Sequence, residues 1–399
     1  MFWERKLDEF VTQLSSEHQV PMGIHLWNGK QIDLSESPKV IVEVPSVASL
    51  RHLIKPTLNS LGEAYVEGKL QVEGTVTDII DVASQLVEAS TGGALEHSKS
   101  KRFRHSRKID AESIAYHYDV SNDFYREWLD TNMVYSCGYF HALDDTLEQA
   151  QEQKIDHILN KIRLQPGQTL LDVGCGWGAL IIRAAQKYGA KALGVTISEQ
   201  QYEEAKRRIH AAGLDDCCEV RFQDYRDITG QFDRITSVGM FEHVGLNNLQ
   251  SYFSKLNSLL SDEGIILNHG ITSSDPNSGG APAGGGEFID KYVFPNGELP
   301  HISLVLEQMT RAGLEATDIE NLRRHYAMTL EHWAARFEAK SEKLKTMVDE
   351  RHFRIWRVYL AGCAHAFHQN WVELHQVVAT KAGHYVLPLT RDYIYQDQE

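Results

Sequence analysis

Three glycines on alternate positions, Gly174, Gly176 and Gly178, interrupt an apolar stretch that begins at Leu170. The apolar run, the glycines and the helix-forming residues 179–187 predict a buried strand, a tight turn and the start of a helix. Glycine lets the backbone approach a ligand closely, and the first N–H groups of a helix have no partners inside it. This segment therefore predicts a cofactor cradle.

The glycine spacing and the next strand indicate which cofactor this is. Dinucleotide-binding folds space their glycines as G-x-G-x-x-G and place an acidic residue about 20 positions later. Here the spacing is G-x-G-x-G, and the next predicted strand ends in Thr196 and Ser198. The pattern favours S-adenosyl-L-methionine (SAM), with a nicotinamide cofactor as the less favoured alternative.

Other residues that could do chemistry have structural explanations of equal simplicity. Glu242 and His243 are typical of a helix start, where the dipole favours an acid, and His269 could be a hydrogen-bonded histidine at a strand end. Cys137 and Cys363 could be small buried residues, which we accept for Cys363. A set of aromatic residues at near-helical spacing is more typical of a core than of an acyl tunnel. This set is Trp333, Phe337, Phe353, Trp356 and Tyr359.

Alternating strand and helix patterns must position these residues. The predicted elements are a helix over 146–161, strands over 192–197, 219–222, 233–240 and 264–268, and helices over 199–211, 247–260 and 352–367. This alternation predicts an α/β fold with a doubly wound, Rossmann-like sheet, whose ligands bind at the carboxyl ends of the strands. Both 223–227 and 240–245 follow such ends.

We expect three segments along the chain. Residues 1–96 predict a small N-terminal α+β domain with a strand at 40–44, a helix at 46–58 and short strands within 62–74, and residues 110–399 form the catalytic domain. Residues 97–109 form a basic linker, with six Lys or Arg and no acid over 97–108. This tract is either a solvated connection or a site of attraction to anionic lipid headgroups.

Composition narrows the class of protein. The chain has 399 residues, 42% of them hydrophobic, and a net charge of −15, which disfavours a nucleic-acid partner. Its five cysteines form no ligand framework, so no structural metal is expected, and a reducing compartment is the simplest inference. No stretch reaches the ~18 apolar residues of a membrane span. We expect a cytoplasmic protein.

Several motifs in fixed order resemble one family. They are Tyr118-Asp-Val-Ser-Asn-Asp123, Tyr135-Ser-Cys137, Leu171-Asp-Val-Gly-Cys-Gly-Trp-Gly178, Gly194-Val-Thr-Ile-Ser198, Val238-Gly-Met-Phe-Glu-His-Val-Gly245 and Phe294-Pro-Asn-Gly297. Over residues 110–385 the chain resembles the cyclopropane-fatty-acyl-phospholipid synthases of the mycolic-acid cyclopropane synthase superfamily. Gly270 departs from the pattern, because family members often have Thr there. The resemblance implies that the methyl group of SAM is transferred to a cis double bond in a phospholipid acyl chain.

The resemblance also implies the roles of particular residues. A bound bicarbonate takes a proton from the new methyl group and is held by Cys137, Glu242, His269, Ile271 and Tyr326. SAM lies over Gly174 and Gly176. The remaining SAM contacts are Thr196, Ile197 and Gln201 at the ribose, Asp224, Tyr225 and Arg226 near the adenine, and Tyr118, Tyr135 and Ser136 at the methionine end.

Partners and alternatives follow from the same resemblance. Phospholipid at the inner membrane surface is the expected partner, with transient adsorption through the N-terminal domain and the basic tract, and a homodimer is possible. One alternative is an enzyme that makes methyl-branched or methylene-branched chains, and another is a small-amine N-methyltransferase of the same fold. A catalytically silent lipid-binding scaffold is the alternative from a different class.

Overall fold

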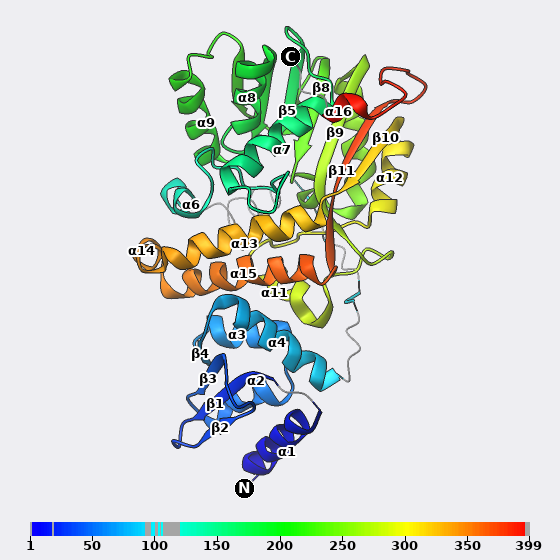
Figure 1. Cartoon of the computed structure of the whole chain (residues 1–399). Helices are drawn as coiled ribbons and strands as arrows, with labels where there is room; N and C mark the ends of the chain where they lie inside the picture. Colours follow the sequence, from blue (N-terminus) through cyan, green and yellow to red (C-terminus); the bar gives the residue numbers. More distant parts are fainter. Residues whose placement is uncertain are drawn as a thin grey trace.

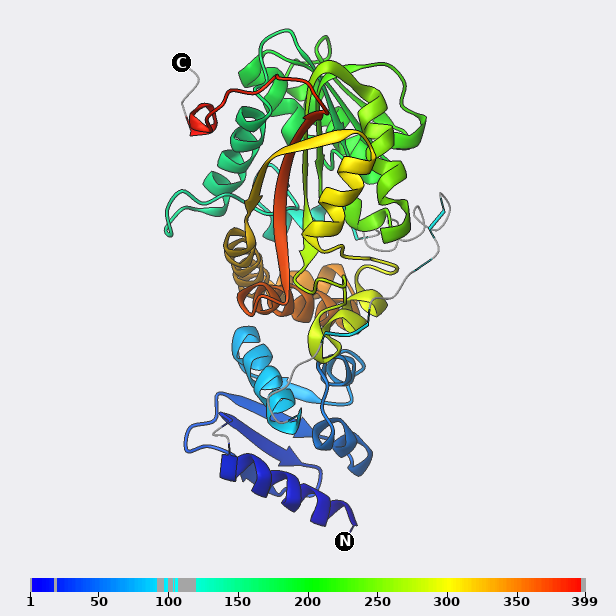
Figure 2. The same ribbon diagram turned by 90° about the vertical axis from the view of Figure 1, so that its right-hand side faces the viewer.

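The computed structural model describes residues 2–17, 20–91, 97–99, 103, 105–106 and 120–395. These residues form two sheets, which lie at opposite ends of an elongated molecule with helices between them (Figures 1 and 2). Tyr118 and most of the basic tract fall outside the described residues.

The N-terminal unit is a four-stranded sheet in the order β2-β1-β3-β4, covered by helices, with its own apolar core. Its strands are β1 (Met22–Leu26), β2 (Gln31–Asp33), β3 (Val40–Val44) and β4 (Gln71–Glu73). Its helices are α1 (Phe2–Glu17), η1 (Val47–Leu50), α2 (Arg51–Ile54), α3 (Leu58–Val66) and α4 (Val76–Thr91). The predicted strand at 40–44 is confirmed.

The prediction of strands within residues 62–74 is wrong for its first half, where α3 lies. A capping box starts this helix: the Ser60 N–H donates to Thr57 Oγ1 at 3.0 Å, and the Thr57 N–H donates to Ser60 Oγ at 2.9 Å. Gly62 lies within this helix, where a Cβ would lie 2.8 Å from the Phe288 ring, so glycine allows α3 to pack closely on that ring. The helix predicted over 46–58 ends instead at Ile54, since Pro56 disfavours helical geometry in the residue before it.

The described part of the catalytic domain contains a seven-stranded sheet in the order β10-β11-β9-β8-β5-β6-β7. Its strands are β5 (Thr169–Val173), β6 (Lys191–Thr196), β7 (Cys218–Phe222), β8 (Phe232–Val238), β9 (Leu260–Ser273), β10 (Leu314–Asn321) and β11 (Val372–Lys381). All neighbours from β9 to β7 pair in parallel, and β11 is antiparallel to both β9 and β10. The predicted α/β Rossmann-like class is confirmed.

Helices cover both faces of this sheet. One face packs against α7 (Leu147–Lys161), α8 (Ala179–Tyr188) and α9 (Glu199–Ala211), and the other against α10 (Leu249–Leu259) and α12 (Ile302–Arg311). The predicted helix over 199–211 has the same bounds as α9. Strand β9 continues to Ser273, beyond the predicted end at 268, because β11 pairs with it over residues 265–273.

A helical layer lies between the sheet and the N-terminal unit (Figure 1). It contains α6 (Asn122–Trp128), η5 (Pro282–Gly284), α11 (Gly285–Tyr292), α13 (Arg323–Ala339), α14 (Ser341–Met347) and α15 (Glu350–His368). The short α16 (Asp392–Tyr395) packs on α7 instead. The aromatic residues at near-helical spacing are all buried in this layer, so the core interpretation is right for them. Tyr359 also lines a cavity.

Candidate active site

A cavity of about 330 Å³ lies at the carboxyl ends of β5, β6 and β8, where a doubly wound sheet binds its ligands. Every predicted cofactor residue that the structure describes lines it: Tyr135, Ser136, Gly174, Gly176, Thr196, Ile197, Gln201, Asp224, Tyr225 and Arg226. Tyr118 lies outside the described residues. We call this space the cofactor cavity.

The glycine turn is shaped as the sequence predicts. Gly174 and Gly176 have φ values of +79° and +53°, which side-chain-bearing residues rarely adopt. A Cβ at Gly174 would approach Met240, whereas a Cβ at Gly176 would have nothing within 4 Å. The backbone at Gly176 is therefore open to a ligand in the cofactor cavity.

Polar side chains at the ends of β6 and β7 form short networks around this cavity. Thr196 Oγ1 donates to Gln201 Oε1 at 2.9 Å, and both side chains are buried. Asp224 caps η2 (Tyr225–Asp227), and its two carboxylate oxygens accept from Arg226 Nε at 2.8 Å and Nη2 at 2.6 Å. These contacts hold hydroxyl, amide and carboxylate oxygens in place, which suits the hydroxyl and amino groups of an adenosine.

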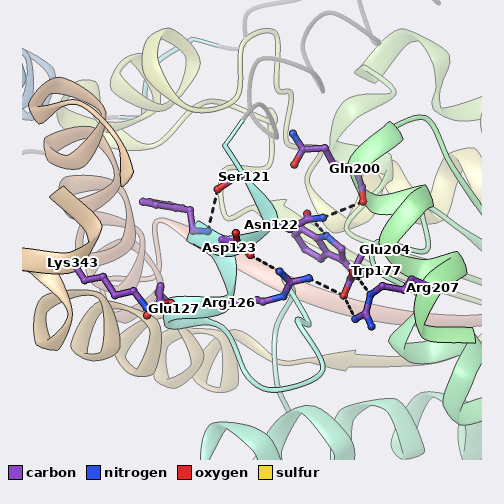
Figure 3. A network of polar contacts seen from close by, with 11 residues as sticks. Ser121, Asn122, Asp123, Arg126, Glu127, Trp177, Gln200, Glu204, Arg207 and Lys343 are labelled. Carbon is purple, nitrogen blue, oxygen red and sulfur yellow. Dashed lines mark hydrogen bonds and ion pairs between the residues drawn. The ribbon is translucent and has the colours of Figure 1, made fainter. Parts of the chain in front are cut away.

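Helix α6 is tied to the glycine turn and to α9 (Figure 3). The Trp177 indole N–H donates to Asn122 Oδ1 at 2.8 Å, and the Asn122 amide donates to the Gln200 carbonyl at 3.3 Å. Arg126 pairs with Glu204 at 2.9 Å. These contacts fix α6 beside the cofactor cavity.

Sequence reasoning missed two charged residues of the cofactor cavity, Lys154 and Asp172. Lys154 is 2% exposed, and its Nζ donates to Ser136 Oγ at 2.9 Å, while Asp172 accepts from Thr236 Oγ1 at 2.7 Å. Burial lowers the pKa of Lys154 to about 8 and raises that of Asp172 to about 6. A signal was available for both, since Lys154 lies on the apolar stripe of α7 and Asp172 lies within an apolar strand.

A second cavity of about 340 Å³, lined mostly by apolar groups, brings together all five predicted catalytic residues. These are Cys137, Glu242, His269, Ile271 and Tyr326. The two cavities share the lining residues Tyr135, Ser136, Gly239 and His243. We call this second cavity the apolar cavity. A methyl group carried in the cofactor cavity would therefore face a ligand in the apolar cavity.

Glu242 points one carboxylate oxygen into a protein contact and leaves the other unpaired. It lies in η3 (Phe241–His243), and its Oε1 accepts from the Ile271 N–H at 2.7 Å. Its Oε2 is buried and has no hydrogen-bond partner among the described residues. Burial raises the pKa of Glu242 to about 7. The Ile271 N–H donates to Glu242 and is therefore not available to an anion, so the expected role of Ile271 at the anion is exerted by orienting Glu242.

His269 is oriented by a chain of hydrogen bonds from β11. Lys161 Nζ donates to Gln376 Oε1 at 3.0 Å, which leaves the Gln376 amide N–H to donate to His269 Nδ1 at 3.1 Å. Burial lowers the pKa of His269, so the ring is neutral and carries its proton on Nε2. This buried Nε2 has no hydrogen-bond partner among the described residues. It is a donor available to a ligand.

The other residues of this site are held in apolar surroundings. Cys137 is fully buried, and burial raises the pKa of its thiol, which therefore stays protonated and is a poor nucleophile. Burial likewise raises the pKa of the Tyr326 hydroxyl. Cys363 lines the apolar cavity, so the view that it is only a small core residue needs correction.

Glu298 is a further residue that the sequence did not reveal. Its buried carboxylate accepts from the Phe103 N–H at 2.8 Å and from the Leu246 N–H at 2.6 Å, and its own N–H donates to the Glu242 carbonyl at 3.3 Å. It connects the described part of the basic tract to the turn that carries Glu242. Nothing in the sequence distinguishes this acid from a surface residue.

The fold and the site together define a class of methyltransferase, and the comparisons agree. The chain belongs to the mycolic acid cyclopropane synthetase family, whose model matches residues 105–377. A domain of unknown function matches residues 10–92. The protein is a SAM-dependent C-methyltransferase.

Particular relatives can be named. A probable fatty acid methyltransferase of Pseudomonas putida is 46% identical over 395 residues, which cover 98% of this chain and 100% of the relative. The cyclopropane-fatty-acyl-phospholipid synthase of Escherichia coli is 34% identical and covers 88% of this chain and 90% of its own. The mycolic acid cyclopropane synthase CmaA1, solved with SAH and CTAB, superimposes with a TM-score of 0.65 at 36% identity, over 68% of this chain and 98% of its own.

Within the described residues, no group of His, Cys, Asp and Glu is arranged to hold a metal ion. In the same part of the chain, no helix is long and apolar enough to cross a bilayer.

Proposed function

We propose that the protein transfers the methyl group of SAM to a cis double bond of an unsaturated acyl chain in a phospholipid and closes a cyclopropane ring. The observation that carries this proposal is the place where the two cavities meet. Glu242 and His269, whose Oε2 and Nε2 are the buried polar atoms without partners described above, line the apolar cavity near the shared residues Gly239 and His243 in the chain. The apolar walls suit a hydrocarbon chain, and the polar atoms suit a proton transfer beside it.

In the first step the π bond of the acyl chain attacks the methyl carbon of SAM, the carbon–sulfur bond breaks, and sulfur keeps the electron pair. The adjacent chain carbon becomes a cation, which apolar walls protect from water. A base then removes a proton from the new methyl group, and the freed electron pair forms the second carbon–carbon bond of the ring.

Bicarbonate fits the polar end of the apolar cavity and would supply the base there. The neutral His269 ring offers an N–H to an anion, and the Glu242 carboxyl, with its pKa raised to about 7, offers a proton or a lone pair. The Ile271 N–H fixes Glu242, and the Gln376 amide fixes His269. These residues hold and orient a base rather than supply one from a strongly basic side chain.

The Glu242→Ala variant tests this assignment. It should bind SAM with unchanged affinity in calorimetry and lose at least a hundredfold in turnover on phospholipid vesicles, since a misplaced base misses a short-lived cation. The wild type should slow in carbonate-free buffer and recover when bicarbonate is added. Full cyclopropanation without carbonate would exclude the bicarbonate step and make Glu242 or His269 itself the base.

Product analysis separates the alternative reactions. Mass spectrometry of the extracted acyl chains distinguishes a ring from a branch. The same cation would give a methyl-branched alkene by losing the proton of the methylated carbon, or a methylene branch by a 1,2-hydride shift followed by loss of a methyl proton. A small-amine N-methyltransferase would ignore bicarbonate and methylate an amine in place of lipid. Retention of SAM binding without any methyl incorporation would indicate a silent scaffold.

We further propose that the enzyme is cytoplasmic and docks transiently on the inner membrane surface to reach its lipid. The N-terminal unit and the basic tract are the contacts we assign to docking. A homodimer would place two such surfaces on one membrane, and sedimentation equilibrium would measure it.

A further inference from the structure

The apolar cavity does not end inside the catalytic domain. It continues into the N-terminal unit, where residues from β1, β3, α2, α3, β4 and α4 form its wall. Those that matter here are Met22, Val40, Leu53, Leu61, Ala83 and Leu86. The sequence of this unit contains no residues with an evident chemical role, and the unit matches a domain of unknown function.

The part of the cavity inside the N-terminal unit is lined by apolar side chains. Leu61 and Ala83 are partly exposed, whereas Met22, Val40 and Leu53, at most 1% exposed, lie in the packed core behind them. They belong to the core between the small sheet and its helices. The polar atoms at Glu242 and His269 lie on the catalytic side instead. A ligand end placed in the N-terminal unit must therefore be hydrocarbon, because a charged end would lose its hydration without compensation.

The two halves of the cavity are held together by polar contacts between the domains. On α15, Arg354 donates to the Tyr65 carbonyl at 2.8 Å and Arg357 to the Tyr65 hydroxyl at 3.0 Å. Lys291 on α11 pairs with Glu63 on α3 at 2.7 Å. The close fit of Gly62 against Phe288 adds an apolar contact. The N-terminal wall is thereby kept in register with the catalytic residues.

We infer that the N-terminal unit binds the methyl-terminal segment of the acyl chain and limits how long that segment can be. This inference rests on the proposed function, since it takes the double bond to lie at Glu242 and His269. The charged headgroup stays outside the cavity at the membrane surface, so the methyl end of the chain is the end that enters the N-terminal unit. The hydrocarbon beyond the double bond then lies against the apolar residues of that unit, which remove it from water.

The test narrows this end of the cavity with Ala83→Leu on α4. Three phospholipids serve as substrates, carrying palmitoleoyl, oleoyl or cis-vaccenoyl chains. The oleoyl chain is one ethylene unit longer than the palmitoleoyl chain on the methyl side, and the cis-vaccenoyl chain is longer on the carboxyl side. The variant should lose about tenfold in kcat/KM on oleoyl lipid relative to the other two, because only that chain needs the space.

The matched control is Gln85→Leu, which adds apolar bulk to the exposed face of the same helix. It should leave the three rates in their wild-type ratios. Equal losses of the variant on all three lipids, or a selective loss on cis-vaccenoyl lipid, would overturn the inference. Leu61→Ala, which widens the same cavity, should shift preference toward the oleoyl chain, and it remains informative if the narrowing variant misfolds.

Binding without turnover separates this inference from the proposed function. Displacement of cis-parinaric acid by oleate and palmitoleate reports occupation of the cavity whether or not methyl transfer follows. Ala83→Leu should weaken oleate about tenfold more than palmitoleate. Selective weakening with no methylation by the wild type would contradict the proposed reaction alone. Normal methylation with unselective binding would contradict only the inference.

Discussion

Glu242 and His269 each keep a buried polar atom that no described residue satisfies. Leaving such an atom without a partner costs about 1–3 kcal/mol, so buried polar atoms of folded proteins are usually hydrogen-bonded. Glu242 and His269 both line the apolar cavity, which shares lining residues with the cofactor cavity. A small polar ligand that pairs with both atoms would remove this cost.

The raised pKa of Glu242 makes a prediction about stability. The folded state holds this proton up to a pH of about 7, whereas the ordinary value is 4.5. Its stabilising contribution is therefore complete below pH 4.5 and is lost as the pH rises to 7, at about 1.4 kcal/mol per pH unit. Glu242→Gln, which cannot titrate, should gain stability relative to the wild type across this window and then stay level. Urea unfolding at several pH values measures the difference, and a difference independent of pH would refute the shift.

The open backbone at Gly176 predicts that a side chain added there lowers the affinity for SAM. Gly176→Ala places a methyl group where the backbone is open to the cofactor cavity, so SAM affinity should fall at least tenfold in calorimetry. Gly167 is the matched control, because its φ is +80° and its Cβ would also meet nothing within 4 Å, but it lies away from the cavity. Both substitutions should cost about 1 kcal/mol of stability. Equal SAM affinities of the two variants would show that Gly176 does not touch the cofactor.

Among the elements, β9 decides most about the site. Its carboxyl-terminal half carries His269 and Ile271; β8 pairs with this half as far as His269, and β11 pairs with it through Ser273. Gly270 lies between them. A Cβ at this position would lie 1.7 Å from the Phe241 ring, so the glycine allows η3 to pack directly on β9. This packing brings Glu242 within hydrogen-bond distance of Ile271.

We predict that Glu298 stabilises the turn from η3 to η4 (Leu246–Asn248). Glu298→Ala leaves the buried N–H groups of Phe103 and Leu246 without their acceptor, at about 1–3 kcal/mol each. The variant should unfold at a lower temperature, be cut faster by trypsin in the basic tract, and lose turnover as the turn with Glu242 loosens. Thermal unfolding and timed proteolysis measure these effects.

Glu298→Gln is the control for this prediction. It keeps one acceptor oxygen and the side-chain shape, so it should recover part of the stability and protease resistance. If the alanine variant were cut at the wild-type rate, Glu298 would not hold the tract.

At the scale of the whole molecule, the two cavities and the two domains form one arrangement. In the reaction proposed above, SAM occupies the cofactor cavity and the acyl chain occupies the apolar cavity. The two cavities share the lining residues Tyr135, Ser136, Gly239 and His243. The helical layer with α11, α13 and α15 lies between the two sheets (Figure 2). Its helices carry the aromatic core and one wall of the apolar cavity. Loss of contact between the domains should therefore affect lipid use before SAM binding.

Charge segregation makes a prediction about membrane binding. The chain has a net charge of −15, yet residues 97–108 carry six positive charges. Each basic residue near an anionic surface contributes roughly 1 kcal/mol of attraction, and salt screens it. Reversing four of them to Glu should reduce sedimentation with phosphatidylglycerol vesicles at low salt and matter less at high salt. The four are Lys101, Arg102, Arg104 and Arg107.

An equal change of net charge elsewhere is the control. Reversal of four exposed basic residues of the catalytic domain should leave most of the vesicle binding intact. These are Lys191, Lys206, Arg311 and Lys345. Equal losses in the two variants would assign the effect to net charge, and no loss in the first would return the tract to a plain linker.

The fold class and the residues at the strand ends could be predicted from local sequence patterns. Gly174 and Gly176 have few backbone alternatives, and hydrophobic periodicity over long helices such as α9 is a local property. The ends of parallel strands meet at one edge, so strand order alone brought Thr196 and Asp224 to the cofactor cavity. The family motifs then placed Glu242 and His269 at one site.

Which of those groups a ligand can use depends on contacts between residues far apart in the chain. The Ile271 N–H is taken by Glu242, and the tautomer of His269 depends on Gln376 and Lys161, each more than a hundred residues away in the chain. Helix α3 was mistaken for strands because a capping box and the fit of Gly62 on Phe288 outweighed local propensity. The residues of the N-terminal unit that line the apolar cavity cannot be distinguished from ordinary core residues in the sequence. Burial against a cavity and burial against a neighbouring side chain require the same apolar residues.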